Sequence, residues 1–268
     1  MNEYEASFSD DRQQVHAVLM AGGLGTRLRP VTDVLPKILL PVAGRPLLDY
    51  VLDRIVAAGI HRVDLMLGHS AGLINAYVGA NRERWPSLRL TANVEDTPLG
   101  TAGPLGLLEE PNSHLLVLNG DVLTDADLGD IAGQHIRSGA DLTVVAAPHA
   151  TEVPFAVLES DGSGQITSLV EKPTYQHRVA AGMYVLGPRC RSVFVSRGPD
   201  DMPALVARAL AAKQVVREYR LDSATTWCEI GTAPGYAEAR QKAAALQLLE
   251  PASSPRKVQR VSERREFV

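Results

Sequence analysis

A glycine-rich segment near the N-terminus carries the residue types best suited to chemistry. An apolar run over 15–20 leads into Ala21, Gly22, Gly23, Leu24, Gly25, Thr26 and Arg27. Glycines let the backbone approach a ligand closely and present successive N–H groups. The guanidinium of Arg27 binds phosphate oxygens in a fork, and Lys37 adds a compact charge shortly afterwards. We predict that this segment binds a polyphosphate; the alternative is a strand-to-helix turn whose glycines serve backbone geometry alone.

Two common phosphate-binding motifs do not fit this segment. A P-loop ends in Gly-Lys-Ser/Thr, whereas Gly25 is followed by Thr26 and Arg27. The dinucleotide-binding fingerprint would use Gly23 and Gly25 as its first two glycines, but Leu28 occupies the place of the third. Neither motif therefore describes this segment.

A carboxylate follows a second apolar run. Residues 115–118 lead directly into Asn119, Gly120 and Asp121. Open α/β sheets bind ligands at the carboxyl ends of their strands, and Mg²⁺ is commonly held by one or two carboxylates together with substrate phosphates. Asn-Gly-Asp taken alone is more typical of a turn. The carboxylate of Asp121 is of the type that holds such an ion.

The elements that must position these residues alternate between apolar runs and helical patterns, which is typical of an α/β protein. The helix expected at 46–58 starts with Pro46 and carries Leu47, Val51 and Ile55 on one face. Further helices are expected at 125–137, 202–213 and 236–249, and strands at 16–19, 63–67, 88–93, 115–118, 142–147 and 181–186. A turn at 161–164 between 155–159 and 166–170 predicts a β-hairpin.

The composition limits the classes to which the protein belongs. The chain has 268 residues, of which 45% are hydrophobic and 22% charged, and this is ordinary for a globular protein. A net charge of -4 gives no support for nucleic-acid binding, and no apolar stretch approaches the roughly 20 residues of a membrane span. Cys190 and Cys228 match no metal or redox spacing, so we expect two reduced thiols in a cytoplasmic protein.

A long pattern in the first part of the chain resembles the opening of the sugar-1-phosphate nucleotidyltransferases. Residues 22–32 read Gly-Gly-x-Gly-Thr-Arg-Leu-x-Pro-x-Thr, and residues 36–46 read Pro-Lys-x-Leu-x-Pro-Val-x-x-x-Pro, with every fixed position filled. Similar motifs follow in order at 118–121, 170–173, 181–184 and 227–232, so the resemblance covers about 15–247. The segment 98–105, preceded by Glu95, is most similar to the mannose-1-phosphate guanylyltransferases.

The resemblance implies a fold, a reaction and a set of site residues. The expected fold is a Rossmann-like domain at 15–249 with three layers, a mixed, mainly parallel sheet covered by helices on both faces, and a small antiparallel insertion. A loose N-terminal arm at 1–14 and a basic C-terminal tail at 250–268 would flank it. The expected reaction joins a nucleoside triphosphate (GTP favoured) and a sugar-1-phosphate, with Mg²⁺, to give a nucleotide-sugar and pyrophosphate.

By the same resemblance, Arg27 would bind the leaving phosphates, and Lys37 with Lys172 would bind the acceptor phosphate and the α-phosphate. Asp121 and Glu229 would hold Mg²⁺. The nucleotide is expected at Ala21, Gly22, Gly23, Gly25, Thr26, Glu95, Gly100, Thr101, Asn119 and Gly120. The sugar is expected at Ala156, Glu171, Gly182 and Thr232.

The chain departs from the family pattern at several positions. Glu229 replaces the usual aspartate and Ala233 a proline, so Glu229 is either a metal ligand or a surface residue beside a turn. Ala156 and Ala180 replace a glycine and a frequent asparagine in the acceptor half, which predicts an unusual acceptor. Thr101 has a second interpretation as a helix cap. Open alternatives are uridylyl, thymidylyl or cytidylyl transfer to another sugar or cyclitol phosphate, a silent nucleotide-sugar-binding regulator, and assembly into a homo-oligomer.

Overall fold

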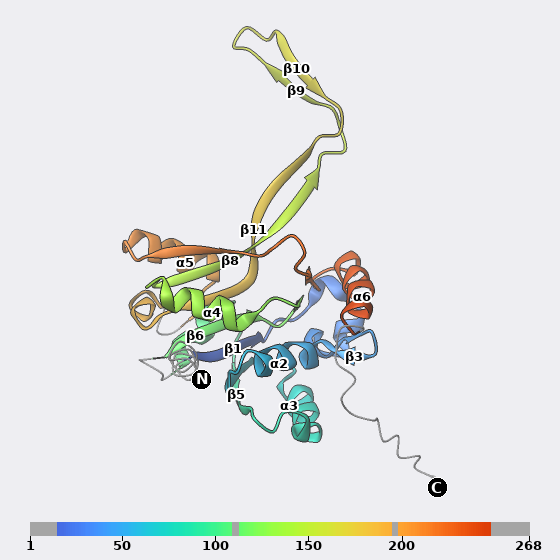
Figure 1. Ribbon diagram of the computed structural model, residues 1–268. Coiled ribbons are helices and arrows are strands. Elements are labelled where there is room, and N and C mark those ends of the chain that lie inside the picture. The colour runs from blue at the N-terminus through green and yellow to red at the C-terminus, as the bar shows by residue number, and fades with distance from the viewer. Residues whose placement is uncertain (1–14, 109–112, 195–197, 248–268) are drawn as a thin grey trace, which may run out of the picture.

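One seven-stranded sheet organises the structure, a computed structural model that describes residues 15–108, 113–194 and 198–247 (Figure 1). In spatial order the strands are β12 (Val216–Arg220), β8 (Leu142–Glu152), β11 (Thr174–Leu186), β6 (His114–Asn119), β1 (Val15–Ala21), β4 (Arg62–Leu67) and β5 (Arg89–Val94). β11 is antiparallel to both of its neighbours, and every other neighbouring pair is parallel. The predicted mixed, mainly parallel sheet is confirmed.

Side chains on the two faces of the sheet pack into separate cores. On β1, Ala17 and Leu19 belong to one hydrophobic cluster and Val18 to the other, because successive side chains of a strand point to opposite faces. The first cluster includes residues of α2 (Leu47–Ala57), α3 (Ala71–Ala80) and α4 (Leu128–Arg137). The second includes residues of α5 (Met202–Ala211) and of the 3₁₀ turns η5 (Gly103–Leu107) and η6 (Pro188–Val193). The expected three layers are therefore present.

A third cluster lies where the chain passes beyond the main sheet. It joins α6 (Ala233–Gln247) to the short strands β2 (Pro41–Val42), β7 (Val122–Thr124) and β13 (Trp227–Glu229). β2 pairs with β3 (Arg45–Pro46). Between β1 and β2 the chain makes three 3₁₀ turns, η1 (Thr26–Leu28), η2 (Val31–Asp33) and η3 (Lys37–Leu39). A further turn, η4 (Arg82–Arg84), precedes β5. The antiparallel pairing of β13 with β7 brings the C-terminal part of the chain beside Asp121.

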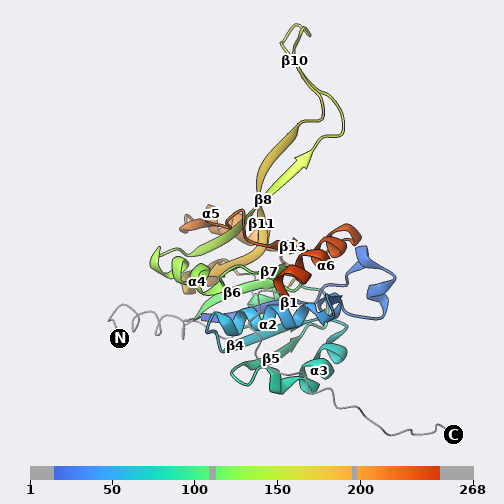
Figure 2. The same cartoon turned by 45° about the vertical axis from the view of Figure 1, so that its right-hand side comes forward.

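A two-stranded ribbon projects from the body (Figures 1 and 2). It comprises residues 148–178, in which β8 and β11 continue their pairing outward from Pro148 opposite Arg178 to Glu152 opposite Thr174. The antiparallel strands β9 (Val157–Ser160) and β10 (Ile166–Val170) form its tip. We call residues 148–178 the hairpin ribbon. Both long strands exceed the predicted 142–147 and 181–186, because pairing between the two continues beyond the buried part of each strand.

Most other predicted elements are present with shifted boundaries. α4 begins at Leu128 rather than 125, because the Asp127 carboxylate accepts a hydrogen bond from Asp130 N at 2.9 Å and so caps the helix there. The sequence patterns did not predict α3, which buries only Ala71 and Ile74, nor the edge strand β12. The predicted N-terminal arm at 1–14 and C-terminal tail at 250–268 lie outside the described residues.

Two global expectations concern the cysteines and the membrane. Cys190 and Cys228 are both buried and form no disulfide, and burial raises the pKa of the Cys190 thiol to about 12. Within 15–108, 113–194 and 198–247, no helix combines the length and the apolar composition that crossing a bilayer requires.

Candidate active site

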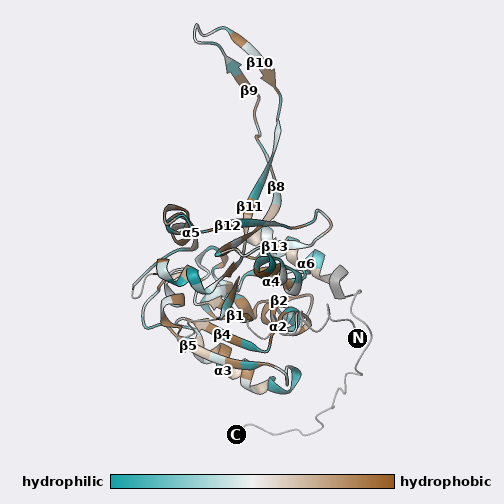
Figure 3. Cartoon of the chain, turned by 60° about the vertical axis from the view of Figure 1, so that its left-hand side comes forward, coloured by the Kyte–Doolittle hydropathy of each residue, from teal (hydrophilic) through white to brown (hydrophobic). Residues whose placement is uncertain are grey.

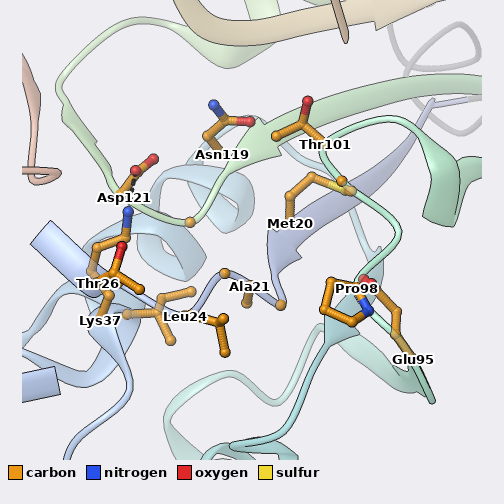
Figure 4. A pocket seen from close by; sticks show the side chains of 16 residues that line it. Met20, Ala21, Leu24, Thr26, Lys37, Glu95, Pro98, Thr101, Asn119 and Asp121 are labelled. Atoms are coloured by element: carbon orange, nitrogen blue, oxygen red, sulfur yellow. Dashed lines mark hydrogen bonds and ion pairs between the residues drawn. The ribbon is translucent and has the colours of Figure 1, made fainter. Parts of the chain in front are cut away.

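A cavity of about 390 Å³ opens at the carboxyl ends of β1 and β6 (Figure 4). All ten residues predicted to bind the nucleotide line it, namely Ala21, Gly22, Gly23, Gly25, Thr26, Glu95, Gly100, Thr101, Asn119 and Gly120. Lys37 and Asp121 line it as well. Its volume falls within the range of about 300–1,000 Å³ that is usual for small-molecule sites. Segments distant in the sequence therefore converge on one cavity.

Four lining residues, Met20, Leu24, Ile38 and Pro98, were not among the predicted site residues. Each of the four is apolar and lies next to, or within, one of the sequence motifs described above. These side chains therefore form part of the apolar wall of the cavity and offer a ligand no polar contact. An apolar wall beside a few polar groups is the usual composition of a ligand pocket. The signal that could have found these residues was their position in the motifs, not their chemistry.

The glycine-rich segment is held in a fixed turn. Gly25 has a φ of 63°, a left-handed conformation that glycine adopts without strain. Its carbonyl accepts hydrogen bonds from Leu28 N at 2.9 Å and from the Thr32 hydroxyl at 2.8 Å. The amides of Gly23 and Leu24 donate to no described residue. Hydrogen bonds to the Gly25 carbonyl thus fix the turn, and the amides of Gly23 and Leu24 remain as donors for a ligand. Anion-binding loops use backbone amides in this way.

Two ion pairs join the predicted catalytic cations to the predicted metal ligands. Lys37 pairs with Asp121 in the cavity, where both side chains are largely buried and point toward each other (Figure 4). Arg27 Nη2 lies 3.4 Å from Glu229 Oε1, and both side chains are exposed, at 65% and 49%. Neither Arg27 nor Glu229 lines the cavity itself. The structure therefore holds one pair inside the cavity and the other outside it.

The backbone explains why residues so far apart in the sequence are neighbours. Glu229 on β13 lies opposite Val122 on β7, and Ile230 N donates a hydrogen bond to the Asp121 carbonyl at 2.7 Å. Strand pairing thus places the Glu229 backbone directly beside that of Asp121. The Glu229 side chain itself is exposed, so its assignment as a metal ligand stays a prediction beside the alternative of a surface residue next to a turn.

The donor set fits a magnesium ion. Among the described residues, no three or more His, Cys, Asp or Glu side chains form a group that could hold a metal. Mg²⁺ does not need such a group, because it is usually bound by one or two carboxylates with substrate phosphates completing the shell. Asp121 and Glu229 supply hard carboxylate oxygens from adjacent backbone positions, and each carboxylate faces a cation that a bound phosphate would also attract.

On the opposite side of the cavity, hydrogen bonds hold the loop that was predicted to bind the base. The Glu95 carboxylate accepts from Leu99 N at 2.9 Å and so closes the loop. The Thr101 hydroxyl accepts from Met202 N at 3.0 Å, at the first turn of α5. The local helix entry is the 3₁₀ turn η5, whose N-cap is Ala102 and not Thr101, so the second interpretation of Thr101 as a cap of that entry is wrong. Thr101 instead ties the loop to the start of α5 and also lines the cavity.

Asn119, which lines the cavity, lies beside Gly182, which does not line it. The Asn119 Oδ1 atom is buried and has no hydrogen-bond partner among the described residues. Gly182, with a φ of 71°, lies where the pairing of β11 with β8 shifts register between Ala180 and Tyr184. A Cβ atom at position 182 would lie 2.9 Å from Asn119 Nδ2. Glycine is therefore required there for the close approach, and Asn119 presents an amide oxygen that a ligand could satisfy.

The other predicted sugar-site residues do not gather at the cavity. The Thr232 hydroxyl accepts from Gly235 N at 3.3 Å, in the first turn of α6. Ala156, Glu171 and the predicted catalytic residue Lys172 all lie in the hairpin ribbon, are exposed, and line no part of the cavity. The reason is the continued pairing of β8 with β11, which carries the intervening chain outward.

Comparison with known proteins identifies a family model and several relatives that match most of the chain. The family model described as nucleotidyl transferase matches residues 16–245. A mannose-1-phosphate guanylyltransferase of Mycobacterium tuberculosis is 34% identical over 232 residues, which cover 82% of this chain and 62% of that protein. A mannose-1-phosphate guanyltransferase of Yarrowia lipolytica is 30% identical over 221 residues, which cover 80% of this chain and 60% of that protein. The chain thus spans about 60% of the length of these relatives.

Solved structures share the fold. HddC from Yersinia pseudotuberculosis superposes with a TM-score of 0.65 at 22% identity, covering 85% of this chain and 98% of that one. Its complex with GMP-PN superposes with a TM-score of 0.63 at 24% identity, with the same coverage. The family expected from the glycine-rich segment is confirmed by the match over 16–245: this chain belongs to the nucleotidyl transferase family.

Proposed function

We propose that the protein transfers a nucleotidyl group from a nucleoside triphosphate, with GTP favoured, to a sugar-1-phosphate, releasing pyrophosphate. The observation that carries this proposal is the convergence of the glycine-rich loop, Lys37 and Asp121 on one cavity of about 390 Å³. A glycine-rich turn whose Gly23 and Leu24 amides donate to no described residue, a lysine and a carboxylate are the groups needed to bind a polyphosphate and its metal.

The proposed reaction is a direct displacement. A phosphate oxygen of the sugar-1-phosphate attacks the α-phosphorus of the nucleotide in line, the bond to the β-phosphate oxygen breaks, and pyrophosphate leaves with the electron pair. The attacking oxygen is anionic at neutral pH, so no general base is needed. Catalysis then consists of positioning the two phosphates and neutralising their charge.

The chain's own groups divide this work. Lys37, already in the cavity, would meet the α-phosphate, and Arg27 at the cavity edge would meet the leaving phosphates. Each would exchange a carboxylate partner for a phosphate oxygen when the nucleotide binds. Bound Mg²⁺, held by Asp121 and Glu229, would supply further neutralisation of phosphate charge.

The preference for GTP and a manno-configured sugar is supported by the relatives. Both curated relatives described above carry the name of a mannose-1-phosphate guanylyl transferase, and HddC was solved with GMP-PN. The chain departs from the family pattern at Ala156 and Ala180, both in the segment expected to bind the sugar. The identity of the sugar is therefore less well supported than that of the nucleotide. Two buried free thiols fit a protein of the reducing cytoplasm.

The test is pyrophosphate release in the presence of Mg²⁺, with the common nucleoside triphosphates screened against a panel of sugar-1-phosphates. We expect release with GTP and mannose-1-phosphate. Release with another pair would keep the reaction and replace the substrate assignment. Silence across the panel, combined with tight binding of a nucleotide-sugar, would contradict the proposed activity and support a regulatory role.

A further inference from the structure

A second hollow lies at the edge of the sheet, between α4 and β12. It has a volume of about 680 Å³ and shares no lining residue with the cavity at the ends of β1 and β6. Its volume falls within the range that is usual for small-molecule sites. We call it the α4–β12 groove, and it is lined by Gln134, His135, Ser138, Thr143 and residues 216–220. The reaction proposed above uses none of these residues.

Arg217 is a lining residue on the edge strand of the sheet. β12 pairs in parallel with β8, and Arg217 lies opposite Thr143 in that register. Tyr219 packs against the core cluster that includes residues of α4. Side chains two residues apart on a strand share a face, so Arg217 lies on the α4 side of the sheet. Among the described strands β12 pairs only with β8, and it is mainly hydrophilic (Figure 3). The groove thus runs over a polar edge strand beside a helix.

The groove carries a cation without a partner. Arg217 is exposed and forms no hydrogen bond or ion pair with any described residue. The lining carboxylate, Glu218, is already engaged, because it accepts from Arg220 Nε at 2.8 Å and from Arg178 Nε at 2.7 Å. These hydrogen bonds, the one from Arg220 first, hold the pKa of Glu218 below its ordinary value. The positive charge of Arg217 is therefore left for a ligand to neutralise.

Neutral hydrogen-bonding groups complete the lining. His135 and Thr143 are exposed by only 1% and 3%, and His135 Nδ1 lies 2.8 Å from the Thr143 hydroxyl. Burial lowers the pKa of His135 to about 4, so its ring adds no charge at neutral pH. When the His135 ring donates to Thr143, the hydroxyl proton of Thr143 can turn toward a ligand. The Gln134 amide, which offers two further donors, has no partner among the described residues.

Both walls of the groove continue into the strands beside the predicted metal ligands. α4 follows β7, which begins immediately after Asp121, and β12 precedes β13, which ends at Glu229. β7 and β13 pair with each other. The Tyr219 hydroxyl donates to the Asp130 carboxylate at 2.8 Å, so β12 and α4 are already joined near the groove. A ligand that contacts both walls would therefore act on two elements that lead directly to the cavity.

We propose that the α4–β12 groove binds a phosphorylated small molecule and is an effector site for the cavity. The phosphate meets the Arg217 guanidinium, which binds phosphate oxygens in a fork, and the Gln134 amide. The volume of the groove exceeds what a phosphate alone would fill, so the rest of the molecule lies beside Val216 and Tyr219. The binding site goes beyond the proposed function and does not depend on it.

Amide NMR titrations at constant ionic strength test the site directly. We expect glucose-6-phosphate to shift the amides of 134–138 and 216–220, and to bind there more tightly than inorganic phosphate does. Arg217→Gln should weaken this binding at least about tenfold, because a charged hydrogen bond is lost. Arg89→Gln is the matched control, since Arg89 is an exposed arginine on β5, the opposite edge strand.

Three results of these titrations would overturn the proposed site. The first is a set of shifts confined to the glycine-rich segment 22–26. The second is equal binding to the wild type, Arg217→Gln and Arg89→Gln. The third is equal affinity for glucose-6-phosphate and inorganic phosphate, which would leave an adventitious ion only.

Calorimetry of GTP binding with Mg²⁺ tests the link to the cavity. We expect saturating glucose-6-phosphate to change the Kd for GTP at least about fivefold more in the wild type than in Arg217→Gln, which is the low end of usual coupling between sites. Competition within the cavity is the same in both chains, so the difference between them reports the groove. Equal changes in both chains would overturn the effector role. A wild-type protein with shifts in the groove but no turnover with any substrate pair would contradict the proposed function and keep the second site.

Discussion

The cavity lined by Lys37 and Asp121, here called the cleft, and the hairpin ribbon carry the two halves of the proposed site. The two regions are built in opposite ways. The cleft is formed at strand ends above buried cores, with Lys37 and Asp121 largely buried against each other. The ribbon has two strands, no core, and exposed Glu171 and Lys172 without partners. The residues proposed to bind the nucleotide thus line a preformed cavity, whereas Glu171 and Lys172, proposed for the acceptor, lie on the ribbon and line no part of it.

This difference separates two steps, the binding of the nucleotide in the cleft and the contribution of the ribbon residues to the acceptor. A site on rigid strand ends holds its groups in place before the ligand arrives, which favours tight nucleotide binding. Glu171 and Lys172 lie outside the cleft. Substitutions in the cleft should therefore act on the nucleotide and the metal, and substitutions in the ribbon should act on the acceptor.

The largest effect is expected for Arg27→Ala, on the cleft side. Arg27 would stabilise the leaving phosphates, so its loss should lower kcat by about 10²–10⁴-fold, as for other transition-state charge partners. The measurement is steady-state pyrophosphate release with saturating substrates. Arg29→Ala is the matched control, because Arg29 is exposed, pairs with Asp33 at 3.0 Å and lines no part of the cavity. A loss smaller than about tenfold for Arg27→Ala would remove Arg27 from the chemistry.

The next effect is expected for Asp121→Asn, which tests the metal assignment in the cleft. Replacing a residue that merely hydrogen-bonds to a metal ligand lowers the affinity for the metal by about 10–100-fold. Replacing the ligand itself should therefore raise the half-saturating Mg²⁺ concentration at least tenfold. A Mg²⁺ titration of activity at fixed GTP measures this shift. Asp96→Asn, at an exposed position near the same cleft wall, serves as the control. An unchanged Mg²⁺ requirement would contradict the role of Asp121.

The sequence predicted the cleft far better than the ribbon, for a physical reason. Residues of the cleft lie in continuous motifs at strand ends, where local pattern fixes backbone geometry; Gly25 has the positive φ that its turn requires. The alternation of apolar runs with helical patterns likewise predicted helices on both faces of the sheet, and Val18 and Leu19 do pack into separate cores. α3 was missed because it buries little and so shows no clear stripe.

The position of Lys172 could not be read from its motif. Glu-Lys-Pro specifies the residues after a strand, but not how far the paired strands beneath it extend from the body. That length depends on register between β8 and β11 over residues distant in sequence, including the shift near Gly182. The proximity of Glu229 to Asp121 also depends on long-range pairing, and there only the family resemblance indicated it.

The smallest effect on turnover at neutral pH is expected from a change that acts on stability, and it contrasts a histidine of the body with one of the ribbon. His135 is buried and hydrogen-bonded to the Thr143 hydroxyl at 2.8 Å, and its pKa is lowered to about 4, first by burial and then by the nearby His114. The unfolded chain takes up a proton near its ordinary pKa of about 6.5, whereas the folded chain stays neutral at that pH. The stability that the neutral His135 contributes is therefore fully present above about pH 6.5 and is lost as the pH falls toward 4.

Chemical denaturation between pH 7 and pH 4.5 measures this dependence. The free energy of unfolding should fall with a slope of up to about 1.4 kcal/mol per pH unit from this one group, and His135→Gln should flatten the slope. His177→Gln is the matched control, because His177 is exposed in the ribbon and has no buried environment to lose. Equal slopes for the wild type and His135→Gln would show that the buried histidine is protonated in the fold. An altered slope for His177→Gln would show instead that this part of the ribbon is buried in solution.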